Sequence, residues 1–319
     1  MSRNLLERLL VTSATLVLAA CGGDGATYVA SLPPPPASPP PSPPPPPPPS
    51  PAQSPAIFPN ITTNTTFAAL GLEANNRSYP FNAPINNNSL IGDGFSVKFD
   101  VATNAYLIGL PSQKPGSFVA FAGPQGPGSW SGYIQGTPFD NVGISTSVPI
   151  GQLAYTAFGV ADGYYTSALS YFAFGSATPA SGIPVTGSAT YDAYVAGATL
   201  DYDASHFPSR TIGGSATLQF DFGAGTLTGH FDPILNVSWP VSSTTNLGSY
   251  TFVNTMYGAG KTDFSGQLSV PGNSSLGDFN GQFTGPAAQE LMARWTAPFL
   301  IPGTQQWSEM FGVWVGKKK

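Results

Sequence analysis

Charged residues and cysteine are scarce in this chain of 319 residues. Charged side chains make up 8% of it, against roughly a quarter in an ordinary soluble domain. The single cysteine, Cys21, excludes a disulfide framework and a cysteine-built zinc or iron–sulfur site. The two histidines, His206 and His230, leave little material for histidine-based chemistry. We therefore expect neither a metal centre nor a bound cofactor.

Basic residues are too few and too scattered for a nucleic-acid-binding protein. The chain has 11 Lys and Arg residues against 16 Asp and Glu, and its one basic cluster is Lys317 to Lys319. A phosphate backbone is bound through rows or patches of Lys and Arg. We predict no nucleic-acid partner.

A catalytic apparatus is equally hard to find. The Gly-x-Ser-x-Gly elbow of serine hydrolases does not occur, and Glu73, Glu290 and Glu309 are widely separated in the sequence. Residues 258–262, Gly-Ala-Gly-Lys-Thr, are similar to the end of a phosphate-binding loop. Thr255 stands where the pattern needs its first glycine, and the flanks alternate like strands, which favours a hairpin turn. The sequence predicts a protein that is not an enzyme.

One group of oxygen and nitrogen ligands is dense enough to weigh as a cation site. Asp192, Asp201, Asp203 and His206 supply ligands of a type that binds a hard cation, but no calcium-loop spacing fits them. We favour polar residues on a solvent-facing loop. His230 is predicted to lie on the polar face of its hairpin.

The N-terminus is typical of an exported lipoprotein. Arg3 and Arg8 precede an apolar run that is too short to span a bilayer, and the run ends in Leu-Ala-Ala-Cys at Cys21. This ending resembles the bacterial lipobox, in which the cysteine is acylated and becomes the mature N-terminus. We predict a lipoprotein signal peptide over residues 1–20 and a lipid anchor at Cys21, with Gly22 favouring the outer membrane. The alternative is a cleaved secretory signal with a chance cysteine.

Proline is concentrated in a segment that follows the signal. Of the 34 prolines, 16 lie between Pro33 and Pro55. Residues 21–57 carry almost no charge or large apolar side chain, so they are predicted to be a disordered tether. In a polyproline II conformation the proline-rich part would reach roughly 70 Å.

The remainder alternates like a β protein. Apolar residues at Ala216, Leu218, Phe220 and Phe222 are followed by a Gly-Ala-Gly turn and a second alternating run, which predicts a hairpin. Glycines inside such runs are typical of a strongly bent barrel wall. Similar strands are expected at the following places: residues 95–99, 105–108, 187–197, 250–257, 264–270, 276–284 and 309–316.

The fold class predicted is all-β. We expect an irregular β-rich handle domain at residues 58–178 and a small eight-stranded antiparallel β-barrel at residues 179–319. The only helix expected in the barrel is a two-turn segment over residues 286–294. An aromatic run between Tyr155 and Phe174, with Trp130 and Tyr133 before it, has two readings. It forms either the handle core, which we favour, or a binding surface.

Three motifs give this chain a family resemblance. They are Gly187-Ser-Ala-Thr-Tyr191, Asp221-Phe-Gly-Ala-Gly-Thr-Leu-Thr-Gly229 and Gly281-Gln-Phe-Thr-Gly-Pro-Ala-Ala-Gln-Glu290. Together they resemble the barrel domain of transferrin-binding protein B and its single-lobed relatives. The resemblance implies a lipid-anchored handle followed by an eight-stranded barrel with a filled interior, and a structural role in the turn for Glu290. The family's Gly-Gly after that glutamate is replaced here by Met292-Ala293 and Arg294-Trp295, so we expect the next strand to pack differently.

The resemblance also implies a function. Family members bind host iron carriers, haem or haem proteins, but this chain has one lobe where transferrin-binding protein B has two, so transferrin binding does not carry over directly. We predict a lipoprotein of the outer membrane, surface-exposed or facing the periplasm, that binds a host protein or a small solute. Its expected partners include a TonB-dependent transporter or a surface-lipoprotein translocator. The alternative is a structural or adhesive coat protein; haem capture would require an axial ligand such as His206, His230, a methionine or a tyrosine.

Overall fold

A computed structural model describes the protein over the following residues: 58, 61–74, 90–113, 116, 118–122, 129–132, 141–162, 168–200, 210–238, 241–270 and 272–319. All of them belong to one compact unit. The predicted signal peptide, the anchor Cys21 and the proline-rich tether lie outside the described residues. No helix in the described ranges is long and apolar enough to cross a membrane.

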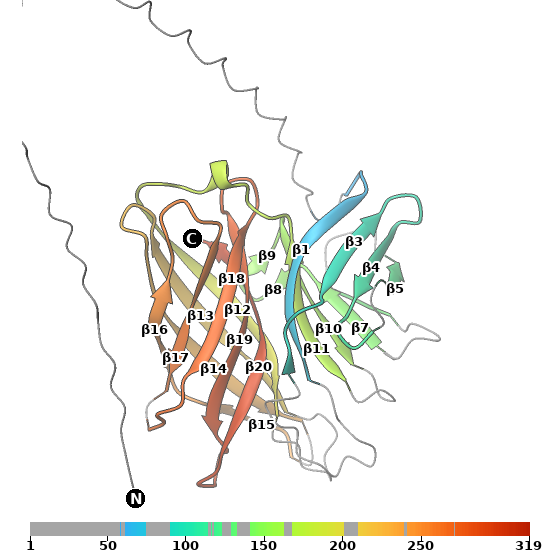
Figure 1. The fold of residues 1–319 in the computed structure, drawn as a ribbon. Coiled ribbons are helices and arrows are strands. Elements are labelled where there is room, and N and C mark those ends of the chain that lie inside the picture. The colour runs from blue at the N-terminus through green and yellow to red at the C-terminus, as the bar shows by residue number, and fades with distance from the viewer. Residues whose placement is uncertain are drawn as a thin grey trace, which may run out of the picture. The chain divides into compact units, whose positions relative to one another are not determined.

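The first half of the described chain forms a single curled antiparallel sheet (Figure 1). Its strands run in the order β5-β4-β3-β1-β11-β10-β7-β6, with β2 paired to β1 and the short hairpin β8–β9 beside it. We call this the half-barrel sheet. Its strands are β1 (Thr65–Ala74), β2 (Leu90–Ile91), β3 (Ser96–Asp100), β4 (Ala105–Gly109), β5 (Val119–Ala122), β6 (Ser129–Gly132), β7 (Asn141–Ser145), β10 (Thr156–Asp162) and β11 (Leu169–Gly175); the hairpin is β8 (Ser147–Val148) and β9 (Gly151–Gln152).

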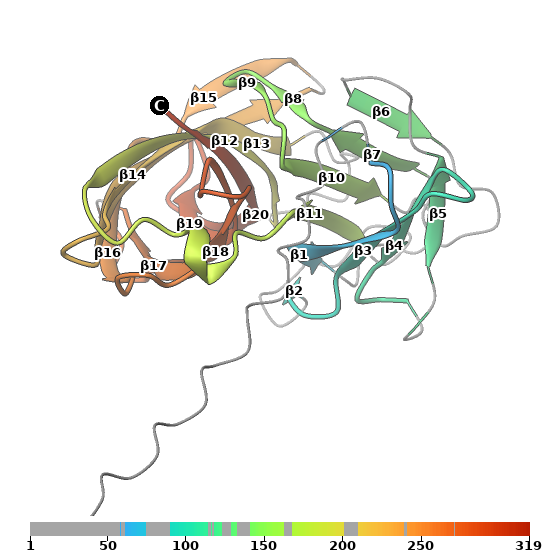
Figure 2. The same cartoon turned by 90° about the horizontal axis from the view of Figure 1, so that it is seen from above.

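The second half forms a closed antiparallel barrel of eight strands, as predicted (Figure 2). The sheet order is β13-β12-β20-β19-β18-β17-β16-β14, and pairing of β13 with β14 closes the ring, while the short β15 lies on β14 outside it. The strands are β12 (Ser188–Thr199), β13 (Arg210–Asp221), β14 (Thr226–Val237), β15 (Ser243–Asn246), β16 (Tyr250–Met256), β17 (Asp263–Ser269), β18 (Gly277–Thr284), β19 (Glu290–Leu300) and β20 (Trp307–Lys318).

The hairpin read from the alternating pattern is confirmed. β13 and β14 pair from Arg210↔Val237 to Asp221↔Thr226, and their odd–even pattern buries Leu218 and Phe220 while Gln219 stays exposed. The turn between them is stabilised by the Asp221 carboxylate, which accepts hydrogen bonds from the backbone N–H groups of Gly223 (3.0 Å) and Ala224 (2.8 Å). Side-chain alternation thus decides which face of each barrel strand points inward.

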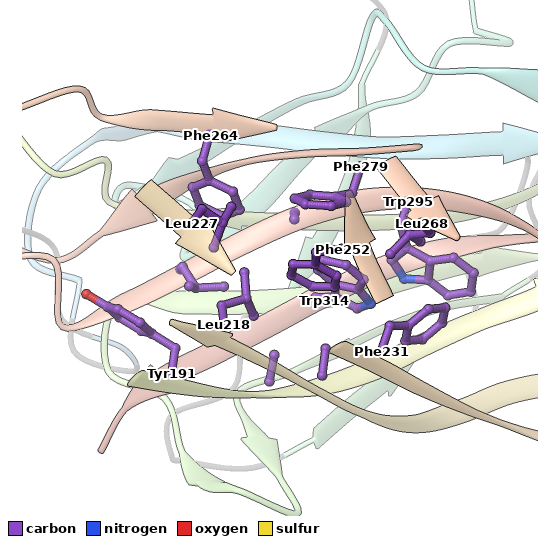
Figure 3. Packing of buried hydrophobic residues seen from close by; sticks show 14 of the residues in the cluster. Tyr191, Leu218, Leu227, Phe231, Phe252, Phe264, Leu268, Phe279, Trp295 and Trp314 are labelled. Atoms are coloured by element: carbon purple, nitrogen blue, oxygen red, sulfur yellow. The ribbon is translucent and has the colours of Figure 1, made fainter. Parts of the chain in front are cut away.

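Aromatic rings fill the barrel interior (Figure 3). Trp314 stacks on Phe252 with ring centroids 5.6 Å apart and lies 5.4 Å from Phe231, which also contacts Trp295 at 4.8 Å. All four side chains are buried. Because the rings pack at such spacings across the lumen, the interior is a core rather than a ligand cavity.

Glycine in the barrel wall makes room for these rings. A Cβ atom added at Gly281 would lie 2.6 Å from the Phe264 ring and 2.5 Å from the Met292 carbonyl oxygen. At Gly266 it would lie 2.6 Å from the Phe279 ring. These strand glycines were predicted to allow bending; the structure shows in addition that each leaves the space that an aromatic ring occupies.

The prediction of a helix over residues 286–294 is wrong. Residues 285–288 form a tight turn in which Gly285 (φ +83°) and Ala288 (φ 53°) are left-handed, and strand β19 begins at Glu290. Both faces of this strand are buried, because Leu291 and Trp295 point into the lumen and Met292 packs outside the barrel. Burial on both faces removes the polar–apolar alternation, so the apolar run is indistinguishable from a buried helix by its pattern.

The aromatic run of the half-barrel sheet is mainly core. Phe172 and Phe174 are fully buried, and Phe174 packs against Phe58, Phe67 and Tyr106 at centroid distances of 5.4 to 5.7 Å. The favoured reading therefore holds for these residues. Tyr164, Tyr165 and Tyr133 and the side chain of Trp130 lie outside the described part of the chain.

Candidate functional site

The half-barrel sheet and the barrel meet along an apolar face of β1, β11, β19 and β20. Met292, Phe311, Val313 and Val315 on the outside of the barrel are buried there. Tyr171 of β11 lies edge-on to Phe311 at 5.9 Å. This cluster makes the two sheets one packed body and positions the polar groups at its margins.

One buried carboxylate lies at a margin of this face. Glu290, at the start of β19, accepts hydrogen bonds from the backbone N–H groups of Ala154 (2.8 Å) and Tyr155 (3.0 Å) in the other sheet. Burial raises the pKa of Glu290, while those two N–H groups, the Thr156 hydroxyl and the Lys317 charge lower it. The residue predicted to stabilise its own turn instead joins the two sheets.

We call the contact of Glu290 with Ala154 and Tyr155 the Glu290 joint. Hydrogen bonds of nearby hydroxyl groups add to this joint between the two sheets. Thr156 and Thr284 share a buried hydrogen bond of 2.5 Å, and the Thr178 hydroxyl donates to the Gly285 carbonyl oxygen at 2.7 Å. The Gly285 N–H in turn donates to the Ser176 carbonyl at 2.8 Å. These groups bond one another across the two sheets, so the joint is structural.

A groove of about 590 Å³ opens beside this joint and is the candidate functional site. One wall is the outside of the barrel, where β17 and β18 present a polar ladder: Asp263 pairs with Gln282, and Ser265 with Asn280. The opposite wall comes from β1 and the segment between β2 and β3 and is largely apolar: Ala69, Leu70, Gly94 and Phe95.

Arg294 is the only cationic side chain among the residues that line this groove. Its Nη1 donates to the Gly92 carbonyl oxygen and lies 3.5 Å from the carboxylate of Asp93, whose side chain is fully exposed. The Arg294 side chain itself is 25% exposed. It therefore links the barrel to the loop after β2 and still presents part of its guanidinium to the groove.

The groove is suited to recognising a polar ligand. Two amides, a hydroxyl and the Asp263 carboxylate on the barrel wall offer both donors and acceptors, and the largely apolar wall, which also carries Asp93, can cover a less polar ligand surface. The groove's volume lies within the range of known small-ligand sites. The arrangement of these groups supports binding.

The predicted site residues fall elsewhere or outside the described chain. Asp201, Asp203 and His206 lie outside it, and Asp192 is 3.0 Å from the Lys319 ammonium. His230 lies on the outer barrel face, 48% exposed and 3.3 Å from Asp232. The loop at residues 258–262 joins β16 to β17 as a hairpin turn, closed by a hydrogen bond of 2.9 Å from Lys261 N–H to Gly258 O, as predicted.

Sequence reasoning missed the groove. Its walls are about 170 to 225 positions apart in the chain, so no local spacing joins them. The one sequence feature that pointed to this region was the replacement of the family's glycines by residues 292–295. The structure places Met292 in the face between the sheets and Arg294 in the groove.

Comparison with known families agrees with this architecture. Residues 183–318 match the family model described as the C-lobe and N-lobe beta barrels of Tf-binding protein B. These residues include all eight barrel strands. The barrel of this chain is therefore of the transferrin-binding protein B type, and the match lies within these residues.

Solved structures of transferrin-binding protein B also align with the chain. They include a mutant from Haemophilus parasuis Hp5 (16% identity, 81% of this chain and 46% of that chain, TM-score 0.43) and isotype 1 from serogroup B Neisseria meningitidis (16%, 79% and 44%, 0.41). A mutant from Actinobacillus pleuropneumoniae H49 aligns over 79% of this chain and 99% of that chain (13%, 0.37). The chain spans less than half the length of the first two. A search of curated protein sequences finds no match.

Proposed function

We propose that this protein is a non-catalytic lipoprotein of the outer membrane that binds a host protein or a small solute through its half-barrel and barrel. The observation that carries the proposal is the groove beside a filled barrel of the transferrin-binding protein B type. Because rings occupy the lumen, a ligand would bind on the outer surface, and the groove offers mixed polar groups there. Iron carriers and haem are the first ligands to test, since the relatives are named for transferrin binding.

Cys21 supplies the membrane anchor in this proposal. A triacylated cysteine buries enough methylene groups for lasting attachment, at about 0.8 kcal/mol for each. The proline-rich segment of residues 21–57 then holds the binding body away from the lipid. A TonB-dependent transporter or a surface-lipoprotein translocator encoded nearby would be the expected partner.

The anchor is tested in cells. Globomycin, which blocks the lipoprotein signal peptidase, should accumulate the uncut precursor, and Cys21→Ser should abolish labelling with a radioactive fatty acid. A Cys21→Ser protein that is processed and released just as the wild type is would contradict the lipid anchor.

Binding is tested on the full chain, purified in detergent. Transferrin, haemoglobin and haem are offered in turn, with surface plasmon resonance for the proteins and the Soret band for haem. The double variant Asn280→Ala/Gln282→Ala removes two groove amides, and we expect at least a tenfold loss of affinity. Gln267→Ala, on the same polar ladder but outside the groove, is the matched control.

The outcomes separate the proposal from its rival. A ligand that binds wild type and the control but loses affinity for the double variant supports the groove. If none of the probes binds the full chain, the proposed iron-related role is wrong, and a passive coat protein becomes the better account. Equal affinity for the double variant would exclude the groove as the site.

A further inference from the structure

A second cavity, of about 400 Å³, lies where β19 ends and β20 begins, and it shares no residue with the groove. Leu276, Pro298 and Trp307 form an apolar part of its wall. Trp307 is 39% exposed although it is one of the largest apolar side chains in the chain. The partly exposed ring of Trp307 is therefore available to contact a ligand in this cavity.

The charged group in this cavity is a carboxylate without a cation. Glu309 of β20 lines it, and Asp278 of β18, on the other side of β19, adds a second negative charge that acts on it. Burial raises the pKa of Glu309 and the Asp278 charge raises it further, while a hydrogen bond with Thr296 lowers it. Over the residues that the structure describes, neither carboxylate forms an ion pair.

We propose that this cavity binds a small organic ammonium ion with an apolar body. The ammonium group would lie against the Glu309 carboxylate, where partial burial strengthens the Coulomb attraction. The ring of Trp307 adds cation–π attraction at the lip, and Leu276 and Pro298 cover the apolar body. The bound ammonium group would thereby compensate the negative charge of Glu309, for which the lining side chains supply no cation.

This inference goes beyond the proposed function, because it concerns a different cavity and a different ligand. It is tested with three probes of nearly equal shape on the full chain in detergent. 2-Phenylethylamine is a cation at neutral pH, 2-phenylethanol is neutral and phenylacetate is an anion. Isothermal titration calorimetry at low salt should show saturable binding of the amine, binding of the alcohol at least tenfold weaker, and none of the anion.

Four variants locate the site. Glu309→Gln keeps the shape and removes the charge, and we expect a loss of about tenfold or more in amine affinity. Trp307→Leu keeps an apolar side chain and removes the ring, with an expected loss of about two- to fivefold; Trp307→Phe should restore part of it. Asp232→Asn removes one negative charge from the outer face of β14, outside the cavity, and should bind the amine like wild type.

Thermal unfolding of each variant first establishes that it is folded. Equal binding of the amine and the alcohol would overturn the proposal, because the carboxylate would then contribute nothing. The same follows if wild type binds no amine, or if Glu309→Gln and Asp232→Asn weaken binding equally. None of these results bears on ligand binding in the groove, which the Asn280→Ala/Gln282→Ala variant tests separately.

Discussion

At the scale of single residues, Glu290 shows how one side chain can join parts of the chain that are far apart. Its two backbone partners lie 136 and 135 positions away, and its own burial opposes its charge. A buried carboxylate is tolerated here because N–H donors satisfy both oxygens. Its raised pKa means that the folded protein takes up a proton more readily than the unfolded chain.

This raised pKa predicts that stability depends on pH. Because the folded-state pKa of Glu290 lies above its unfolded value near 4.5, its contribution to stability is fully present below that value and is lost as the pH rises through the folded pKa. Glu309 acts in the same direction. Urea unfolding of wild type between pH 4.5 and pH 7.5 should therefore show this contribution decreasing with rising pH, and Glu290→Gln should flatten the dependence.

A neutral change in the same turn provides the control. Gln289→Ala removes a side chain whose Oε1 accepts from the Ala287 N–H at 2.8 Å, without removing a titrating group. Its unfolding free energy should shift by a similar amount at every pH. If Glu290→Gln retains the wild-type pH dependence, the carboxylate is not the group that titrates.

At the scale of strands, glycine and aromatic residues act as pairs across the barrel wall. The rings of Phe264 and Phe279 occupy the space beside Gly281 and Gly266. Such pairs help a barrel of only eight strands to hold many rings in its lumen, since a glycine leaves space for the ring that packs against it. The glycine content of these strands therefore follows from packing as well as from curvature.

Substitution of one of these glycines should be costly. Gly281→Ala would bring a Cβ atom to 2.5 Å from a backbone oxygen of β19, so the wall must shift, and we expect about 1–3 kcal/mol of destabilisation. Gly213→Ala is the control, because there the nearest atom within 4 Å is the end of the Asn236 side chain, at 3.3 Å. Guanidinium unfolding measures both, and equal stability of the two variants would contradict the packing argument.

At the scale of the whole molecule, the face between the two sheets makes the half-barrel sheet and the barrel depend on each other. Phe311 is almost wholly buried in it against Tyr171. The hydrogen bonds of Glu290 and of the Thr156–Thr284 pair connect the two sheets at the margin of the same face. The groove exists only because this face holds the half-barrel sheet beside strands β17 to β19.

Loosening this face should affect both sheets. Phe311→Ala removes a buried ring, and we expect a loss of about 3–5 kcal/mol in the free energy of unfolding. Circular dichroism and limited proteolysis should report one transition in wild type and an earlier loss of the half-barrel sheet in the variant. Trp307→Ala, at the exposed start of the same strand, should leave the single transition in place.

The sequence by itself determined the β class, the strand pairs joined by short turns and the inward residues of the barrel. These follow from side-chain alternation and turn residues within a few positions, as in the β13–β14 hairpin. Only the tertiary structure decided that β19 is a strand, because packing on both faces removed its alternation. It also decided the roles of Glu290 and Arg294 and the position of the groove, since these depend on contacts between residues more than 130 positions apart. The local sequence pattern indicates which residues form strands and which side chains point inward. The groove, in contrast, is formed by residues that come together only when the barrel closes and the half-barrel sheet packs against it.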